Sequence, residues 1–186
     1  MEMPKVLKSA GLVLVVAAIL CASPLREGRA QTEAPALAVA EIDYSDTSGE
    51  VTDQSADHAR RLRIFEAALR IDLVAGGKLR SVMLDCPANA CSVGDIDVKQ
   101  LIGKAEAAGA DFLLIGTFHK VSTLIQWAKF DMIDVKAQKL SFERLVSFRG
   151  DNDEAWRRAE AFIVRQIRDR EAELMRSAAA ALPRSP

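Results

Sequence analysis

The segment Phe112–Ile115 constrains the fold of this chain most strongly. Its unbroken apolar run is typical of a strand that is covered on both faces of a sheet. The stretch that follows, Thr117–Ile125, mixes polar and apolar residues, which predicts that the strand extends past the covering helices toward solvent. We therefore expect a sheet with helices packed on it.

Patterns typical of alternating strands and helices precede this segment. We expect a strand at Leu37–Tyr44, an amphipathic helix at His58–Val74 and a second strand at Leu79–Leu84. A short helix follows, with Asp97 and Gln100 as the capping box at its start and Gly109 at its end. Two right-handed crossovers of this kind give the parallel portion of a sheet.

Two further strands, Trp127–Val135 and Leu140–Phe148, follow the central segment. The polar link between them is short, so we expect antiparallel neighbours. Within the second strand, the alternating pattern places Leu140 on the same face as Phe142.

A long helix is expected to close the domain, over Asn152–Met175, with Asp151 and Glu154 as its capping box and residues 176–186 as a flexible tail. The predicted fold class is thus α/β, more exactly an α+β mixed sheet. Its order is strand-helix-strand-helix, then a three-strand antiparallel meander and a long C-terminal helix.

The N-terminus has the pattern of a secretory signal peptide. Lys5 and Lys8 precede an apolar run from Ala10 to Leu20, and a small-x-small cleavage site ends at Ala30. We therefore expect residues 1–30 to be a signal peptide cleaved near Ala30, with the product in the periplasm or secreted. Residues 31–175 are then expected to form a single secreted domain.

A lipid anchor on Cys21 is the alternative to cleavage at Ala30. Leu20 stands where a lipoprotein signal has a small residue, which favours cleavage at Ala30.

The chain carries 25 basic and 26 acidic residues, and the leader is itself basic, so the mature chain is weakly acidic. This charge argues against nucleic acid as a partner. The absence of a second long apolar stretch predicts no stable membrane insertion after cleavage.

Cys86 and Cys91 are the two cysteines of the expected mature chain. Their spacing in an oxidising compartment predicts a local disulfide. A thiol redox protein that uses the pair is the alternative, although redox cysteines are typically separated by two residues and a metal site needs further ligands.

The sequence lacks the common hydrolase, metalloprotease and nucleotide-binding motifs, so we expect no enzyme, no catalytic, cofactor-binding or metal residues, and no cofactor. Of the two histidines, His119 is expected to have a structural or surface role, and His58, which opens the first helix, is expected to have no special role. The acidic segment Ser45–Asp57 is expected to be a solvated loop. As a calcium loop starting at Asp43 it would place Ser48 at the sixth position, where an EF-hand has glycine.

These absences favour a soluble periplasmic protein-binding or envelope assembly accessory whose partner is an unknown envelope protein. The residues expected to take part in interaction are Lys120, Ser122, Trp127, Arg149, Arg157 and Arg158. A further alternative is a carrier protein in which Arg149, Arg157 and Arg158, near a helix start, hold a small anionic ligand.

The segments Gly109–Ile125 and Ser147–Val164, with DMIDVKAQKL between them, resemble a family of small secreted bacterial proteins described only as a domain of unknown function. The positions that carry the resemblance are Lys120, Val121, Ser122, Arg149, Gly150, Asn152, Asp153, Glu154, Trp156, Arg157 and Arg158. The element order is similar to the TolB amino-terminal and CsgG-like domains, which are envelope interaction and assembly modules. The resemblance implies no catalytic residues.

Overall fold

The structure, a computed structural model, describes residues 33–87 and 90–181. The predicted signal peptide, its cleavage site at Ala30 and the alternative anchor at Cys21 all lie outside these residues, as does the end of the predicted tail, residues 182–186. Among the described helices, none combines the length and the hydropathy needed to cross a membrane.

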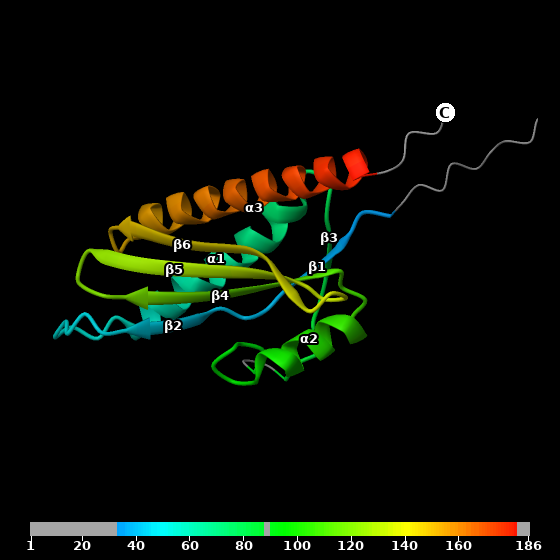
Figure 1. Cartoon of the computed structure of the whole chain (residues 1–186). Helices are drawn as coiled ribbons and strands as arrows, with labels where there is room; N and C mark the ends of the chain where they lie inside the picture. The colour runs from blue at the N-terminus through cyan, green and yellow to red at the C-terminus, as the bar shows by residue number, and fades with distance from the viewer. Residues whose placement is uncertain (1–32, 88–89, 182–186) are drawn as a thin grey trace, which may run out of the picture. The chain divides into compact units, whose positions relative to one another are not determined.

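The described residues form a six-stranded mixed sheet with three helices, which confirms the predicted fold class (Figure 1). The strands are β1 (Ala36–Val39), β2 (Asp43–Asp46), β3 (Arg80–Val82), β4 (Phe112–Lys120), β5 (Ile125–Asp134) and β6 (Lys139–Arg149). The helices are α1 (Ser55–Val74), α2 (Val98–Ala107) and α3 (Asp153–Ala181). The order in the sheet is β3-β1-β4-β5-β6, and β2 also pairs with β4. β1 is parallel to β3 and β4, whereas β4, β5 and β6 are an antiparallel meander.

The predicted first strand is divided into β1 and β2, which lie end to end along β4. The division occurs because two backbone N–H groups between them leave the ladder. The N–H of Glu41 donates to the carbonyl oxygen of Cys91 at 3.1 Å, and that of Ile42 donates to the carboxylate of Glu66 at 2.7 Å.

Helices cover the two faces of the sheet unequally. α1 and α3 pack side by side on one face, and the shorter α2 lies on the other (Figure 1). The larger core lies under α1 and α3 and contains Phe65, Phe118, Phe130 and Trp156. The smaller core lies under α2, and Leu101, Leu113 and Ile115 are among its residues.

The helix starts follow the sequence prediction only in part. Asp97 caps α2, because its side chain accepts from the N–H of Lys99 at 2.7 Å. α1 begins at Ser55, earlier than predicted. α3 is capped by Asn152, which accepts from the N–H of Ala155 at 2.9 Å, so the predicted capping role of Asp151 is wrong.

The predicted end of the last helix is also too early, because α3 continues past Met175 to Ala181.

A second correction concerns β6. A β-bulge between Met132 and Ile133 pairs Phe142 with Met132 but Leu140 with Ile133. This extra residue turns Leu140 to the α2 side of the sheet, where it is 53% exposed. Leu140 therefore does not share a face with Phe142.

Candidate functional site

A fully buried lysine lies at the end of β4. The ammonium of Lys120 donates to Oδ2 of Asp151 at 2.6 Å, to Oε1 of Gln54 at 2.9 Å, and to the carboxylate of Glu50. Its side chain has no exposed surface. Burial acts to lower the pKa of Lys120, but the hydrogen bonds and charges of Asp151 and Glu50 outweigh it and hold that pKa above its usual value.

Asp151 is the hub of this arrangement, which we call the lysine cluster: Glu50, His58, Arg61, Lys120 and Asp151. Besides Lys120, it accepts from Arg61 at 3.0 Å, and Nε2 of His58 lies 2.7 Å from its Oδ2. The side-chain amide of Gln126 also donates to it, at 3.1 Å. Burial acts to raise the pKa of Asp151, but the bonds from Lys120 and His58 hold it at about 2.

The lysine cluster braces the structure. A lysine whose pKa is raised keeps its proton and is a poor nucleophile. The ring of His58 is only 2% exposed, and with Glu50 it lines a pocket of about 520 Å³ between the β2–α1 loop and α1. The cluster joins four parts of the chain: the β2–α1 loop, α1, the end of β4 and the segment before α3.

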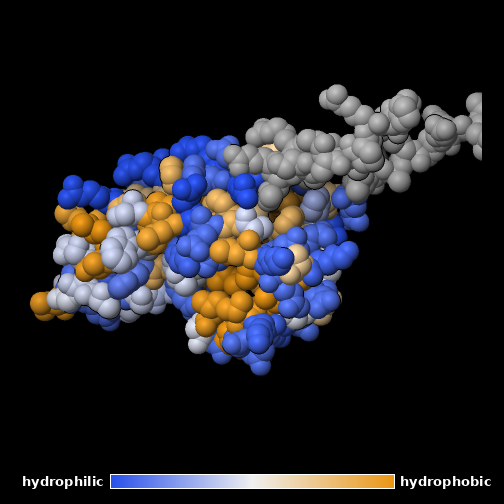
Figure 2. Space-filling model, in the orientation of Figure 1, coloured by the Kyte–Doolittle hydropathy of each residue, from blue (hydrophilic) through white to orange (hydrophobic). Residues whose placement is uncertain are grey.

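The α2 side of the meander carries exposed apolar side chains. We call this surface the open face: His119, Trp127, Lys129, Leu140, Glu143, Leu145, Ser147 and Arg149. Trp127 is 45% exposed and Leu145 is 62% exposed. Where α2 meets the strands, a groove of about 430 Å³ adjoins this face, with Val98 and Ile102 on one wall and Leu140 on the other. Apolar side chains gather on the visible surface of this region (Figure 2).

The lysine cluster and the open face are physically connected. The N–H of Thr47, in the β2–α1 loop, donates to the carbonyl of Lys120 at 2.9 Å. The Thr47 hydroxyl lies 2.7 Å from Nε2 of His119, and the His119 ring meets the Trp127 ring edge to face at 6.1 Å. The loop that the cluster holds therefore positions His119, which packs on Trp127.

The residues predicted for interaction do not form a single surface. Trp127 and Arg149 both lie on the open face, and Ser122 lies in the turn beside it. Lys120 is buried. The remaining two, Arg157 and Arg158, lie on α3 across the sheet, and both pair with one carboxylate of that helix, Glu154. The three arginines considered for an anion site are thus not brought together.

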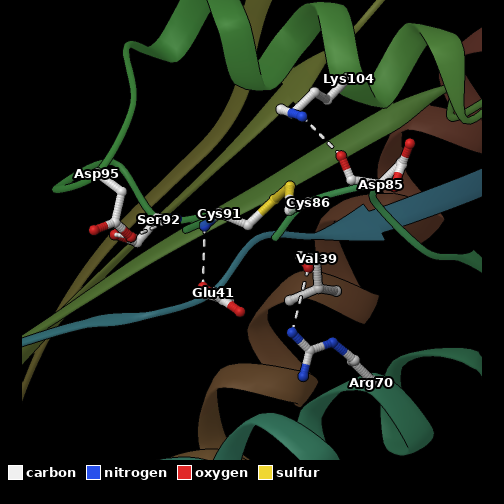
Figure 3. Close-up of a disulfide and its surroundings, with 9 residues drawn as sticks. All are labelled: Val39, Glu41, Arg70, Asp85, Cys86, Cys91, Ser92, Asp95 and Lys104. Atoms are coloured by element: carbon white, nitrogen blue, oxygen red, sulfur yellow. Dashed lines mark hydrogen bonds between the residues drawn. A yellow bond between two sulfur atoms is a disulfide. The ribbon is translucent and has the colours of Figure 1, made fainter. Parts of the chain in front are cut away.

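A disulfide joins Cys86 and Cys91, with 5.7 Å between their Cα atoms (Figure 3). Cys91 is 4% exposed and belongs to the core under α2. Its N–H donates to the carboxylate of Glu41 at 3.0 Å, so the bridge is tied to the segment between β1 and β2. On the other side, the ammonium of Lys104 donates to the carbonyl of Asp85 at 2.7 Å. The bridge fastens the segment between β3 and α2.

A structural role for this bridge predicts a moderate loss of stability without it. Closing so short a loop contributes about 2 kcal/mol on the chain-entropy model. We expect the double variant Cys86→Ser, Cys91→Ser to lose this amount in urea unfolding at pH 7 and to remain folded. A redox role predicts instead that the bridge exchanges readily with a glutathione buffer at periplasmic potentials, which free-thiol titration measures.

The lysine cluster was missed by the sequence analysis. His58 was expected to have no special role, and Glu50 was assigned to a solvated loop. One signal was present: Lys120 has the same alternation phase as Leu114 and Phe118, which places it on the face covered by helices. A lysine in that phase requires buried carboxylate partners.

The family model DUF3280, described as "Protein of unknown function (DUF2380)", matches residues 35–167. This confirms the resemblance to a family of unknown function. No curated protein gives a significant match.

Among solved structures, the hypothetical protein CT253 from Chlamydia trachomatis is similar at 9% identity and a TM-score of 0.53, with 74% of this chain and 98% of that chain covered. TolB from Acinetobacter baumannii is 17% identical with a TM-score of 0.47; the match covers 74% of this chain but only 28% of TolB. The LpoB C-terminal domain from Salmonella enterica is 12% identical with a TM-score of 0.38, with 64% of this chain and 85% of that domain covered. At these identities the likeness to CT253 concerns the fold alone.

Proposed function

The chain belongs to the DUF3280 family, whose description assigns no activity, and we propose that it is a non-catalytic binding or assembly accessory of the bacterial cell envelope. The open face is the surface that docks a protein partner. The observation that carries this proposal is the exposure of Trp127, Leu140 and Leu145 together on one side of a rigid meander.

The composition of the open face suits a protein partner. Tryptophan and arginine are the residues that most often dominate the free energy of protein association, and Trp127 and Arg149 both lie here. Leu140 and Leu145 add apolar area, and the charges of Lys129 and Glu143 lie between them. A polar and apolar mixture of this kind is typical of interfaces that form and dissociate between folded proteins.

The open face is also held rigidly before any partner arrives. Trp127 pairs with His119 on one side and with Ser147 on the other, in a continuous antiparallel ladder. The opposite face of the same strands packs against α1 and α3, so the strands cannot easily deform. A preformed surface loses little conformational entropy on binding, which favours affinity.

The envelope location rests on the N-terminal pattern and on the cysteines. A basic start, a short apolar run and the site at Ala30 are typical of exported proteins. The Cys86–Cys91 bridge fits an oxidising compartment such as the periplasm.

Truncation of the open face should weaken capture of the partner. We expect the double variant Trp127→Ala, Leu145→Ala to lose at least tenfold in affinity, because central aromatic side chains each contribute about 2 kcal/mol or more to association. The measurement is quantitative capture of envelope proteins from native extract by the immobilised protein, followed by binding titration with the captured protein.

The matched control for this experiment is Ile71→Ala. Ile71 is 65% exposed, but it lies on α1, away from the open face. It should leave capture unchanged. Equal capture by the wild type and the double variant would remove the open face as the docking surface, and loss of capture with Ile71→Ala would move the surface to the helical side.

A further inference from the structure

The strand β6 forms one edge of the sheet, and it is much longer than the strands at the other edge. It spans 11 residues and pairs with β5 alone among the described strands. At the other edge, β3 has three residues and β2 has four. Short edge strands and prolines are two means by which proteins prevent pairing with another chain, and β6 has neither.

The hydrogen bonds at the end of the meander establish which backbone groups of β6 point outward. The N–H of Gly150, just beyond β6, donates to the carbonyl oxygen of Leu124 at 2.8 Å, in register with the ladder of β5 and β6. Because bonded and non-bonded pairs alternate along an antiparallel ladder, the even-numbered residues of this stretch bond to β5. The odd-numbered residues direct their N–H and C=O groups away from the sheet: Glu143, Leu145, Ser147 and Arg149. Within the described part of the chain, these outward groups accept and donate no hydrogen bond.

The helix α3 runs along β6 but leaves this stretch of the edge accessible (Figure 1). Arg170 of α3 donates to the carbonyl oxygen of Ser141 at 3.4 Å, before the outward-pointing stretch begins. A groove of about 390 Å³ separates the start of β6 from Gln166 of α3. Arg144, on the side of the strand that faces α3, is exposed, and Val146 is only half-buried. The edge from residue 143 to residue 149 is therefore free to receive another strand.

The charges along β6 are complementary to those of a second copy of the same strand. If two antiparallel copies pair with Val146 opposite itself, Glu143 of each copy lies opposite Arg149 of the other. Leu145 then lies opposite Ser147, and the outward groups of all four odd-numbered residues meet as hydrogen-bonded pairs. The smallest slip that keeps each side chain on its face is two residues. Such a slip places Glu143 opposite Ser147 in one direction and opposite Asp151 in the other, so it removes both ion pairs.

We propose that β6 pairs with β6 of a second copy of this chain in this register, which joins two sheets into one continuous sheet. Opposite charges directly across a strand pair stabilise it, and like charges destabilise it, so the register with Val146 at the two-fold axis is favoured. The axis is perpendicular to the sheet, and the open faces of the two copies therefore lie on the same side of the dimer. This pairing does not depend on a protein partner at the open face.

Exchange of the charges tests the register. Sedimentation velocity of the purified protein over a concentration series should show a reversible equilibrium between monomer and dimer. Glu143→Arg places arginines opposite each other and Arg149→Glu places glutamates opposite each other, so each variant should dimerise about tenfold more weakly or worse. An equimolar mixture of the two variants has opposite charges at both pairs and should form a heterodimer with wild-type affinity. Mixing would not repair a folding defect in either variant.

Two further variants test the pairing of the backbone and the position of the axis. Ser147→Pro removes an outward N–H that is bonded only in the dimer, so it should abolish dimerisation and leave the urea midpoint near that of the wild type. Val146→Cys places two thiols opposite each other at the axis, at a separation that suits a disulfide. It should cross-link two chains under mild oxidation, whereas Val51→Cys, in the exposed loop before α1, should not.

Three results would each overturn the proposal. The first is a protein that stays monomeric across the concentration series. The second is a mixture of Glu143→Arg and Arg149→Glu that forms no heterodimer. The third is cross-linking of Val51→Cys that is as efficient as that of Val146→Cys.

Discussion

Replacing Lys120 by Met is expected to cost about 3–5 kcal/mol in free energy of unfolding, because it leaves buried carboxylates without their cation. Glu50 and Asp151 both contact the ammonium, and their side chains are only 17% and 8% exposed. Urea unfolding at pH 7 measures the loss. Protonation of Asp151 will offset part of this loss of stability, so the pKa of Asp151 should be higher in the variant than in the wild type.

Lys129→Met is the matched control. Lys129 lies on the neighbouring strand and also pairs with two carboxylates, Asp131 at 3.2 Å and Glu143 at 3.8 Å, but its side chain is 44% exposed. A pair in contact with water contributes about 0–1 kcal/mol. If Lys120→Met costs no more than Lys129→Met, the lysine cluster is not a brace.

The lysine cluster also predicts the response to acid. The pKa of Asp151 in the folded protein, about 2, lies below its ordinary value of 3.8, so the folded state favours the ionised form. This contribution to stability is present above about pH 4 and is lost as pH falls toward 2. Lys120→Met should reduce this acid-dependent loss, because it removes one cause of the lowered pKa.

Replacing Phe118 by Ala is the second large effect, and we expect it to cost about 3–5 kcal/mol. The Phe118 ring stacks on Trp156 at 4.7 Å and meets Phe65 edge to face at 4.8 Å, with 1% of its surface exposed. It therefore joins β4 to both α1 and α3. Its removal leaves a cavity at the point where the three elements meet, and thermal and urea unfolding should both report the loss.

The control for this substitution is Phe162→Ala. Phe162 belongs to α3 but is 37% exposed, so its removal creates no enclosed cavity and should cost less than about 1 kcal/mol. If the two phenylalanine variants lose equal stability, the core under α1 and α3 does not have the packing described.

The sequence predicted correctly those helices and strands whose signals lie in residues close together along the chain. The apolar run at Phe112–Ile115 predicted a covered strand, and the side chain of Asp97 predicted the start of α2. The polar link before β6 predicted an antiparallel neighbour. Each of these depends on residues within one or two turns or along one strand, so no knowledge of distant contacts was needed.

Features that depend on distant partners could not be read in this way. Asp151 has the right type and place for a helix cap, but Lys120 and His58 compete for its carboxylate with stronger, charged interactions. Asn152 caps α3 in its place. The bulge that turns Leu140 outward likewise arises from the pairing of β6 with β5. The alternation of residues within β6 alone gives no sign of this bulge.

Site-specific photo-crosslinking in the native envelope tests whether the open face docks a protein partner. A photoreactive side chain at Leu145, on the open face, is compared with one at Arg158, on the exposed side of α3. We expect a discrete adduct with an envelope protein from position 145 and none from position 158. Adducts from position 158 alone, or no adduct from position 145 under conditions in which the protein is folded and exported, would contradict it.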